Sequence, residues 1–254
     1  MQGRIALITG AAGGIGVATA ELFCAQQAKV LLVDRDARVL EQQVASIRGR
    51  VPGAMVEAHV ADVTDHVQAA GAVAGAVKVF GELNVLINNA AVRYLSPVVD
   101  ADLGQWEKVL AVNLLGAVTM SKAALPELRR SKNGCIVILS STYAMVGRRG
   151  FGAYDASKAA LLSLTRTLAF EEAEHGIRVN AVCPGGTLTP YTISRAKGRG
   201  LSETDLRSQA KADTLLKRWG EVLEIAYPIM WLASNEASFV TGATLMVDGG
   251  TSIM

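Results

Sequence analysis

The chain begins with a short apolar run, a glycine-rich turn and a helical pattern, in that order. Residues 4–9, RIALIT, are typical of a buried parallel strand, since an apolar run is bounded by glycine on both sides. The turn TGAAGGIG follows, with Gly10, Gly14 and Gly16, and residues 17–27 continue at helical spacing. Such glycines let the backbone approach a pyrophosphate, while the helix N-terminus offers N–H groups and positive potential. The order of these three elements therefore predicts a dinucleotide-binding unit, although a glycine-rich turn alone would be weak support in a chain with 25 glycines.

Strand and helix patterns alternate along the rest of the chain. Further strands are expected near residues 29–36, 54–60, 83–91, 134–141, 176–184 and 243–250. Helices are expected near residues 36–48, 65–80, 100–130 (two helices), from 154 onward, and 221–233. About seven strands alternating with helices predict an α/β fold, a Rossmann-type doubly wound parallel sheet, in a single domain over residues 1–254.

Residues 190–218 interrupt this alternation. The insertion is the most polar part of the chain and carries Arg195, Lys197 and Arg199 near its start. A polar segment that follows the C-terminal end of a strand is typical of a mobile substrate lid, which we expect at about residues 188–218.

The composition limits the class of protein. A chain of 254 residues with a formal net charge of +2 fits one large α/β domain and gives no electrostatic footprint for nucleic acid. Cys24, Cys135 and Cys183 lie far apart in apolar surroundings, so we expect buried thiols and neither a disulfide nor a metal site. Charged residues interrupt every apolar run before transmembrane length, and the N-terminus lacks a signal-peptide pattern. We expect a soluble, cytoplasmic protein without metal, membrane or nucleic-acid partners.

An acidic residue ends the second expected strand. Asp34 lies 18 residues beyond Gly16, close to the spacing at which a carboxylate accepts hydrogen bonds from the adenosine ribose. A carboxylate there repels a 2′-phosphate, which favours NAD as cofactor. Arg35 follows at once and could stack on adenine or tolerate a phosphate, so NADP stays open.

Polar side chains also follow the third and fourth strands. Asp62, followed by Val63, could bond an adenine amino group, or cap the helix that begins two or three residues later, and both can hold. Asn88, Asn89 and Ala90 suit the floor of a nucleotide crevice, or equally a turn that bonds its own backbone.

A second group of candidates lies around the helix that follows the fifth strand. Tyr154 and Lys158 stand four residues apart, on one face of that helix. A fixed positive neighbour lowers the pKa of a phenol from its usual value near ~10 and so assists proton transfer. Ser140 and Ser141 end the fifth strand, where ligands of such sheets gather. Without further support, an ordinary surface pair is the better interpretation of this Tyr and Lys.

Asn113 is a polar residue among apolar neighbours in the stretch 100–130. We expect a buried amide that needs hydrogen-bond partners. A functional role and a packing role are equally open for Asn113 alone, since buried amides often serve only packing networks.

These residues together resemble the short-chain dehydrogenase/reductase family over essentially the whole chain. The family pattern T-G-x-x-x-G-x-G matches residues 9–16, and Y-x-x-x-K matches residues 154–158. N-N-A-G matches residues 88–91 except that Ala91 replaces the last glycine, a departure that we expect to be tolerated. The catalytic Ser of the family lies 13 positions before its Tyr, which selects Ser141 over Ser140. The family Asn falls on Asn113, and the P-G motif with its following Thr falls on residues 184, 185 and 189.

The resemblance implies an NAD(P)-dependent oxidoreductase that acts on a secondary alcohol or ketone, and the charge of Asp34 favours NAD over NADP. It implies a catalytic set of Asn113, Ser141, Tyr154 and Lys158. Cofactor contacts are implied for Gly10, Gly14, Ile15, Gly16, Asp34, Arg35, Asp62, Val63, Asn89, Ala90, Tyr154, Lys158, Pro184, Gly185, Thr187 and Thr189. Tyr154 would transfer the substrate proton, and Lys158 would lower the pKa of Tyr154 and hold the nicotinamide ribose. Ser141 would orient the substrate oxygen, and Asn113 would hold a water that links Lys158 to solvent.

The substrate is less constrained than the reaction. Arg148 and Arg149, together with the basic residues of the lid, would suit an anionic substrate if they converge on the crevice. Solvated surface positions are equally open for them. Parts of the sequence also look similar to dehydrogenases of cyclic cis-diols and of diol carboxylates.

Two alternatives and one assembly remain as expectations. A 3-oxoacyl thioester reductase using NADPH is one alternative, although Phe170 stands where those enzymes usually carry a carrier-docking Arg. The other is a non-catalytic nucleotide-binding regulator, which the complete catalytic set disfavours. In the family, the helices that carry Asn113 and Tyr154 commonly pack against partner subunits, which implies a homotetramer.

Overall fold

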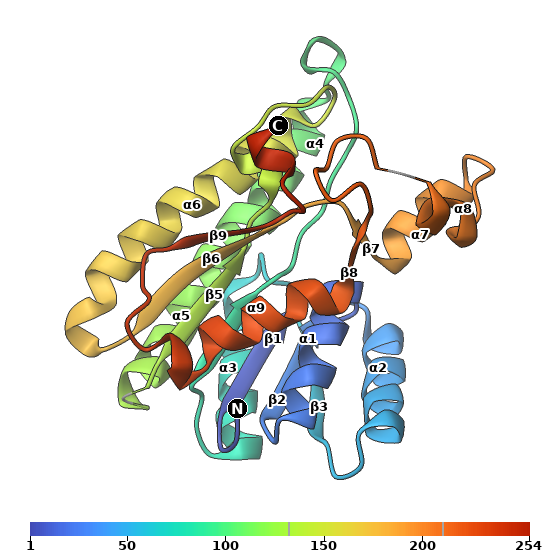
Figure 1. The fold of residues 1–254 in the computed structure, drawn as a ribbon. Coiled ribbons are helices and arrows are strands. Elements are labelled where there is room, and N and C mark those ends of the chain that lie inside the picture. Colours follow the sequence, from blue (N-terminus) through green and yellow to red (C-terminus); the bar gives the residue numbers. More distant parts are fainter. Residues whose placement is uncertain (132, 210) are drawn as a thin grey trace.

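The computed structural model describes residues 1–131, 133–209 and 211–254 and is built around one parallel sheet (Figure 1). The strand order is β3-β2-β1-β4-β5-β6-β9. The strands are β1 (Ile5–Thr9), β2 (Lys29–Asp34), β3 (Met55–Val60), β4 (Val85–Asn88), β5 (Cys135–Leu139), β6 (Arg178–Pro184) and β9 (Thr244–Val247). The predicted doubly wound sheet of seven strands is thereby confirmed. The strand order reverses between β1 and β4, which opens a crevice beyond the C-terminal ends of these strands.

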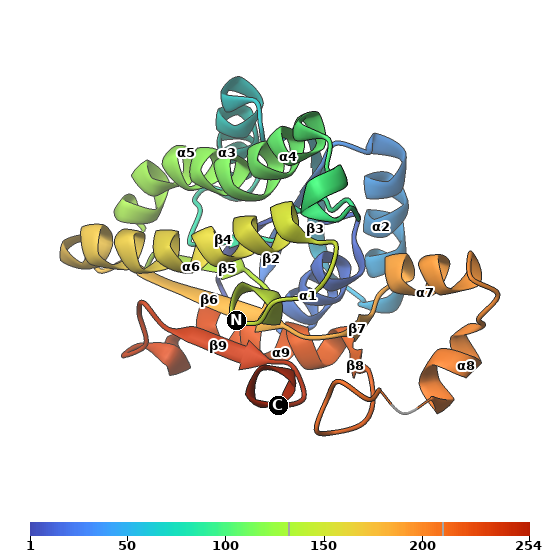
Figure 2. The same ribbon diagram turned by 90° about the horizontal axis from the view of Figure 1, so that it is seen from above.

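Helices cover both faces of the sheet and make a three-layered domain (Figure 2). The first face is covered by α1 (Gly14–Ala25), α2 (Ala37–Arg50) and α9 (Val222–Ala233). The second is covered by α3 (His66–Phe80), α5 (Gly116–Arg130) and α6 (Gly152–Glu172). Successive strand residues serve opposite faces, as Leu7 and Leu86 pack toward α3 and α5 while Ile8 and Ile87 pack toward α1 and α9. Burial on both faces explains why these strands are continuous apolar runs.

The stretch 100–130 forms one continuous helical segment where two separate helices were predicted. It consists of α4 (Leu103–Leu110), a π-helical turn (Ala111–Leu115) and α5. By length and composition this segment could cross a membrane, although Glu107, Lys108 and Lys122 interrupt its apolar residues, as the sequence analysis expected. Its apolar character has a packing reason in this fold, since Met120 and Ala124 are buried in the core against the sheet. Leu115 and Val118 remain exposed.

The polar insertion has structure of its own. It contains α7 (Pro190–Lys197) and α8 (Glu203–Ser208), which stand away from the main sheet (Figure 1). A two-stranded sheet of β7 (Thr187–Leu188) and β8 (Gly220–Glu221), which the sequence did not predict, joins the two ends of the insertion. A small separate core of Leu188, Ala196 and Leu206 holds the helices together.

Candidate active site

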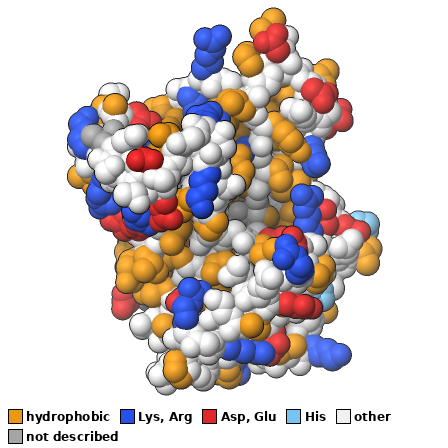
Figure 3. Space-filling view, turned by 90° about the vertical axis from the view of Figure 1, so that its right-hand side faces the viewer, with side chains coloured by type: hydrophobic (Ala, Val, Ile, Leu, Met, Phe, Trp, Pro, Cys, Tyr) orange, Lys and Arg blue, Asp and Glu red, His pale blue; other side chains and the backbone are white. Residues whose placement is uncertain are grey.

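Two adjoining cavities open beyond the C-terminal ends of the central strands. The smaller, of about 410 Å³, lies over the glycine turn and the end of β2. The larger, of about 570 Å³, lies between the ends of β5 and β6 and the α7–α8 segment. Both are lined by Ile15, Asn89, Ala91 and Thr189, so they form one crevice. The space-filling view shows this face hollowed beside the α7–α8 segment, with Lys and Arg side chains around the hollow (Figure 3).

The glycine turn leaves the N-terminus of α1 open to the smaller cavity. No described side chain caps this helix after Gly13, so its first N–H groups remain available to an anion. Gly10 has φ of +64°, and a Cβ there would come within 2.6 Å of the Ala90 Cα. Gly16 lines neither cavity, and its predicted contact with the cofactor stays a prediction. A Cβ on Gly16 would come within 2.8 Å of the Gly10 carbonyl oxygen, so this glycine serves the packing of the turn.

Asp34 ends β2 at the far side of the smaller cavity. Its carboxylate accepts hydrogen bonds from the backbone N–H groups of Ala12 at 3.1 Å and Asp36 at 3.3 Å. These bonds hold the carboxylate between the glycine turn and α2, where it lines the cavity together with Arg35. An open helix N-terminus at one end and a fixed carboxylate at the other fit the pyrophosphate and adenosine ribose of a dinucleotide.

The residues after β3 and β4 line the same cavity. Asp62 accepts hydrogen bonds from the N–H of Thr64 at 2.9 Å and its hydroxyl at 2.8 Å. The suggestion that Asp62 caps the following helix is wrong, because Asp65 directly precedes α3 and accepts from its first N–H groups. Asn89 donates to the carbonyl oxygens of Thr9 and Gly10, which ties the end of β4 to the glycine turn. The remaining predicted residues that line this cavity are Gly14, Val63 and Ala90.

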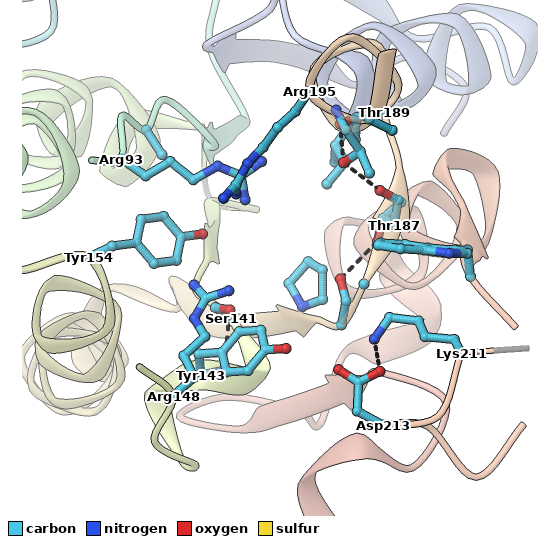
Figure 4. Close-up of a pocket in the computed structure, with 18 of the residues that line it drawn as sticks. Arg93, Ser141, Tyr143, Arg148, Tyr154, Thr187, Thr189, Arg195, Lys211 and Asp213 are labelled. Atoms are coloured by element: carbon cyan, nitrogen blue, oxygen red, sulfur yellow. Dashed lines mark hydrogen bonds and ion pairs between the residues drawn. The ribbon is translucent and has the colours of Figure 1, made fainter. Parts of the chain in front are cut away.

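Ser141, Tyr154 and Lys158 meet in the larger cavity (Figure 4). The Ser140 hydroxyl donates to the Lys158 carbonyl at 2.7 Å, so it is committed to joining β5 to α6. The Ser141 hydroxyl accepts from the Tyr143 N–H at 3.2 Å and faces the cavity. This difference favours Ser141 as the functional serine. Pro184, Gly185 and Thr187 line the same cavity, as does Thr189 at its junction with the smaller one.

Lys158 is buried almost completely, with 2% of its surface exposed. Its ammonium donates to the Leu139 carbonyl at 2.6 Å and lies 5.6 Å from the centre of the Tyr154 ring. Burial lowers the pKa of Lys158 from 10.5 to about 8. The Lys158 ammonium therefore points to the end of β5, where the backbone carbonyl of Leu139 accepts its hydrogen bond.

The pKa of Tyr154 responds mainly to burial and to two arginines. Burial raises this pKa, and the groups that oppose the rise are Arg93 first, then Arg148, then a hydrogen bond to Ser141. The predicted influence of Lys158 on the phenol stays a prediction, and its ammonium lies about as close to the Tyr154 ring centre, at 5.6 Å, as the Arg148 guanidinium does, at 5.5 Å.

Asn113 lies in the π-helical turn and is 1% exposed. Its side-chain oxygen accepts from the Val92 N–H at 2.8 Å, and its amide nitrogen donates to the Val92 carbonyl and the Ser157 hydroxyl, both at 3.0 Å. The expected buried amide with partners is confirmed. The side chain lines neither cavity and instead ties the segment after β4 to α6. π-turns of this kind occur frequently at functional sites.

The larger cavity is strongly basic. Arg148 and, from the insertion, Arg195 and Arg199 line it, whereas Arg149 and Lys197 do not. Arg93 also lines it and was missed by sequence reasoning, although its place five residues after the end of β4 was a usable signal. Further lining residues that the sequence did not single out are Tyr143, Lys211, Asp213 and Trp219. Within the described parts of the chain, no group of His, Cys, Asp and Glu side chains could hold a metal ion.

Comparisons with known proteins agree with this geometry. A family model described as enoyl-(acyl carrier protein) reductase matches residues 10–252. The 2-(S)-hydroxypropyl-CoM dehydrogenase 3 of Xanthobacter autotrophicus is 37% identical over 98% of this chain and 97% of its own length. The 3-oxoacyl-[acyl-carrier-protein] reductase FabG of Thermotoga maritima is 38% identical over 100% of this chain and 99% of its own. The crystal structure of levodione reductase superposes with a TM-score of 0.91 at 32% identity, covering 100% of this chain and 99% of that one.

Proposed function

We infer the reaction of this chain from the premise that it belongs to the short-chain dehydrogenase/reductase family. It is an NAD(P)-dependent oxidoreductase. We propose that it transfers a hydride between NAD(H) and a secondary alcohol or ketone, with oxidation of the alcohol as the favoured direction. The observation that carries the proposal is the meeting of Ser141, Tyr154 and Lys158 beside the junction of two cavities.

The proposed chemistry divides among these side chains. Tyr154 exchanges the hydroxyl proton with the substrate, as base in oxidation and as acid in reduction. Ser141 donates a hydrogen bond to the substrate oxygen and stabilises the charge that develops there. The nicotinamide, when bound, accepts or supplies the hydride. Lys158 would hold the nicotinamide ribose, with its ammonium anchored by the Leu139 carbonyl.

Replacement of Tyr154 by Phe tests the catalytic assignment. Tyr154→Phe removes the proton-transfer group and keeps the ring, so kcat should fall at least ~100-fold. The binding of NAD, measured by calorimetry, should persist. Tyr227→Phe is the matched control, because Tyr227 is exposed on α9 away from both cavities and its loss should leave kcat unchanged. Near-normal turnover by Tyr154→Phe would refute the assignment.

NAD is the proposed cofactor in preference to NADP. The support is the Asp34 carboxylate, which two backbone N–H groups hold at the cavity wall, where it would repel a 2′-phosphate. The test is to compare kcat/KM for NAD and NADP with a panel of secondary alcohols, cyclic diols and acyl thioesters. A tenfold preference for NADP would overturn this part of the proposal.

Reduction of 3-oxoacyl thioesters with NADPH is the second candidate, supported by the identity with the Thermotoga maritima reductase. Phe170 is 88% exposed on α6 and offers an aromatic ring where a carrier-docking Arg would be needed. A non-catalytic regulator is a third possibility in principle. It would bind the nucleotide and turn over none of the alcohols in the panel.

The proposed assembly is a homotetramer. Its support is an apolar groove between α5 and α6, lined by Val118, Leu125, Leu164 and Leu168. Sedimentation of the wild type should give the tetramer mass, and Leu164→Glu should give smaller species.

Two finer proposals concern the insertion and the cell compartment. The α7–α8 segment would act as a substrate lid, because it forms one wall of the larger cavity and has only its own small core.

A cytoplasmic location is supported by the three cysteines, which are buried and free. Fractionation of cells that express the protein would test the location.

A further inference from the structure

We propose that Arg93 and Arg195 bind a carboxylate of the substrate, so that the enzyme acts on hydroxy acids and the corresponding oxo acids. This inference rests on the oxidoreductase function proposed above and specifies its substrate class. The two arginines come from segments that are distant in the sequence, one after β4 and the other on α7. Both line the larger cavity, and their guanidinium groups point to the same part of it, on the side of the Tyr154 hydroxyl (Figure 4).

The charge of the cavity is unbalanced. Its lining contains one acid, Asp213, and six bases, Arg93, Arg148, Lys158, Arg195, Arg199 and Lys211. Asp213 pairs with Lys211, and Asp155 pairs with Arg148 at 3.0 Å. Among the described residues, no acid pairs with Arg93 or Arg195. Cations brought together in a partly enclosed site repel one another unless an anion lies between them, so the arrangement favours a negatively charged ligand.

An aromatic ring lies beside each arginine. The Arg93 guanidinium stacks 4.0 Å from the centre of the Tyr191 ring and so loses little freedom on binding. The Arg195 guanidinium lies farther, at 5.6 Å, from the centre of the Phe151 ring, on which Arg148 stacks at 3.7 Å. The planar forks of both arginines match the two oxygens of a carboxylate. The alternative of solvated surface residues fits Arg149 and Lys197, which are exposed and outside the cavity.

The position of Arg93 also indicates the length of the substrate. Arg93 and Tyr154 line the same cavity, and the Arg93 guanidinium lies on the side of the Tyr154 hydroxyl (Figure 4). A carboxylate bound there is close to the reacting carbon. Short hydroxy acids with the hydroxyl at C2 or C3 therefore fit better than long chains with a distant charge.

The first test compares matched substrates that differ only in charge. The probes are 2- and 3-hydroxybutanoate and their primary amides, assayed with NAD. The wild type should have a kcat/KM at least ~10-fold higher for an acid than for its amide, the low end for hydrogen bonds to a charged group. Arg195→Gln should lower this ratio at least ~10-fold, and Arg195→Lys, which keeps the charge without the fork, should lower it less. Lys197→Gln is the matched control on the same helix and should leave the ratio unchanged. Equal kcat/KM for acid and amide in the wild type would overturn the inference.

The second test measures binding without turnover, which separates this inference from the proposed function. Butanoate, butanamide, butanesulfonate and butyl phosphate are titrated into the NAD-loaded protein by calorimetry. Butanoate should bind at least ~10-fold more tightly than butanamide, and Arg93→Gln and Arg195→Gln should each remove the difference. If no alcohol is oxidised but this pattern appears, the carboxylate site stands and the proposed reaction fails. If neutral alcohols are oxidised and butanoate binds no better than butanamide, the reaction stands and the carboxylate site is refuted. Tighter binding of the sulfonate or phosphate would refute the assignment to a carboxylate.

Discussion

Lys158 should make the free energy of unfolding depend on pH. Its ammonium is buried and donates to one carbonyl, that of Leu139, and burial lowers its pKa from 10.5 to about 8. Between these two pH values the unfolded chain holds a proton that the folded protein has released. The free energy of unfolding therefore rises with pH across this window, and the stabilisation is lost as the pH falls through about 8.

The size of the effect follows from the two pKa values. The full difference between 10.5 and about 8 corresponds to about 3.4 kcal/mol, because one pKa unit is worth about 1.36 kcal/mol. Integrated from pH 8 to pH 10, the Lys158 contribution rises by roughly 2 kcal/mol. Other buried groups act in the opposite direction at the alkaline end. Burial raises the pKa of Tyr154 and of the thiols of Cys24, Cys135 and Cys183, so each favours the unfolded chain once its exposed form ionises.

A comparison of variants isolates the lysine from these other groups. Unfolding by urea is measured at pH 7, 8, 9 and 10 for the wild type and Lys158→Met, and the difference between the two is plotted against pH. The difference should change by roughly 2 kcal/mol between pH 8 and pH 10 in favour of the wild type. Lys158→Arg keeps its charge over this pH range, so the wild type should show the same pH-dependent difference from it as from Lys158→Met. Either variant can serve if the other fails to fold. Lys78→Met removes an exposed lysine from α3 and should give a constant difference. A difference for Lys158→Met that also stays constant would refute the buried, shifted ammonium.

Three further changes test other parts of the site. Asp34→Asn removes the charge that repels a 2′-phosphate and should shift the ratio of kcat/KM for NAD to that for NADP by about 10-fold toward NADP; an unchanged ratio would show that Asp34 does not discriminate. Asn113→Ala leaves the N–H and the carbonyl of Val92 without their hydrogen-bond partner. The free energy of unfolding, measured in urea, should therefore fall by at least ~2 kcal/mol, and a loss below ~0.5 kcal/mol would contradict the bridging role of Asn113. Arg93→Gln removes a cation whose charge lowers the pKa of Tyr154, so the pKa of the phenol should rise. The rise of kcat/KM with pH for a neutral alcohol should move to higher pH, and an unmoved profile would exclude this influence.

The fold could be predicted from the sequence because the central strands β1, β2, β4 and β5 are buried on both faces and are therefore largely apolar runs. The strand ends were less certain, and the observed strands are mostly shorter than predicted by one to three residues at an end. The pairing of β7 with β8 was missed, because each has only two residues and their partnership depends on segments some thirty residues apart. The π-helical turn was missed for a related reason, since one added residue in a helical turn leaves the apolar pattern almost unchanged.

Some site residues could be predicted from local sequence patterns, whereas others depend on contacts between segments that are distant in the sequence. Tyr154 and Lys158 lie on one helix, and Ser141 follows the end of β5 by two residues, so their meeting follows from elements that the sequence already indicates. The packing role of Gly16 and the neighbour relation of Arg93 to Tyr154 depend on contacts between separate segments. Sequence spacing can place Arg93 near the crevice, but it does not show which side chain of another segment it faces.

Asn113 ties the segment that carries Arg93 to the helix that carries Tyr154 and Lys158. Its amide bonds both backbone groups of Val92, the residue before Arg93, and also bonds Ser157, the residue before Lys158. The side chain that the family resemblance assigns to catalysis thus holds the arginine segment and the catalytic helix at a fixed separation. A change at Asn113 should therefore alter both the pKa of Tyr154 and the preference for a carboxylate, whereas a role confined to the relay of protons would alter only the first. Measuring the acid-to-amide ratio of kcat/KM in Asn113→Asp, alongside its pH profile, separates these two roles.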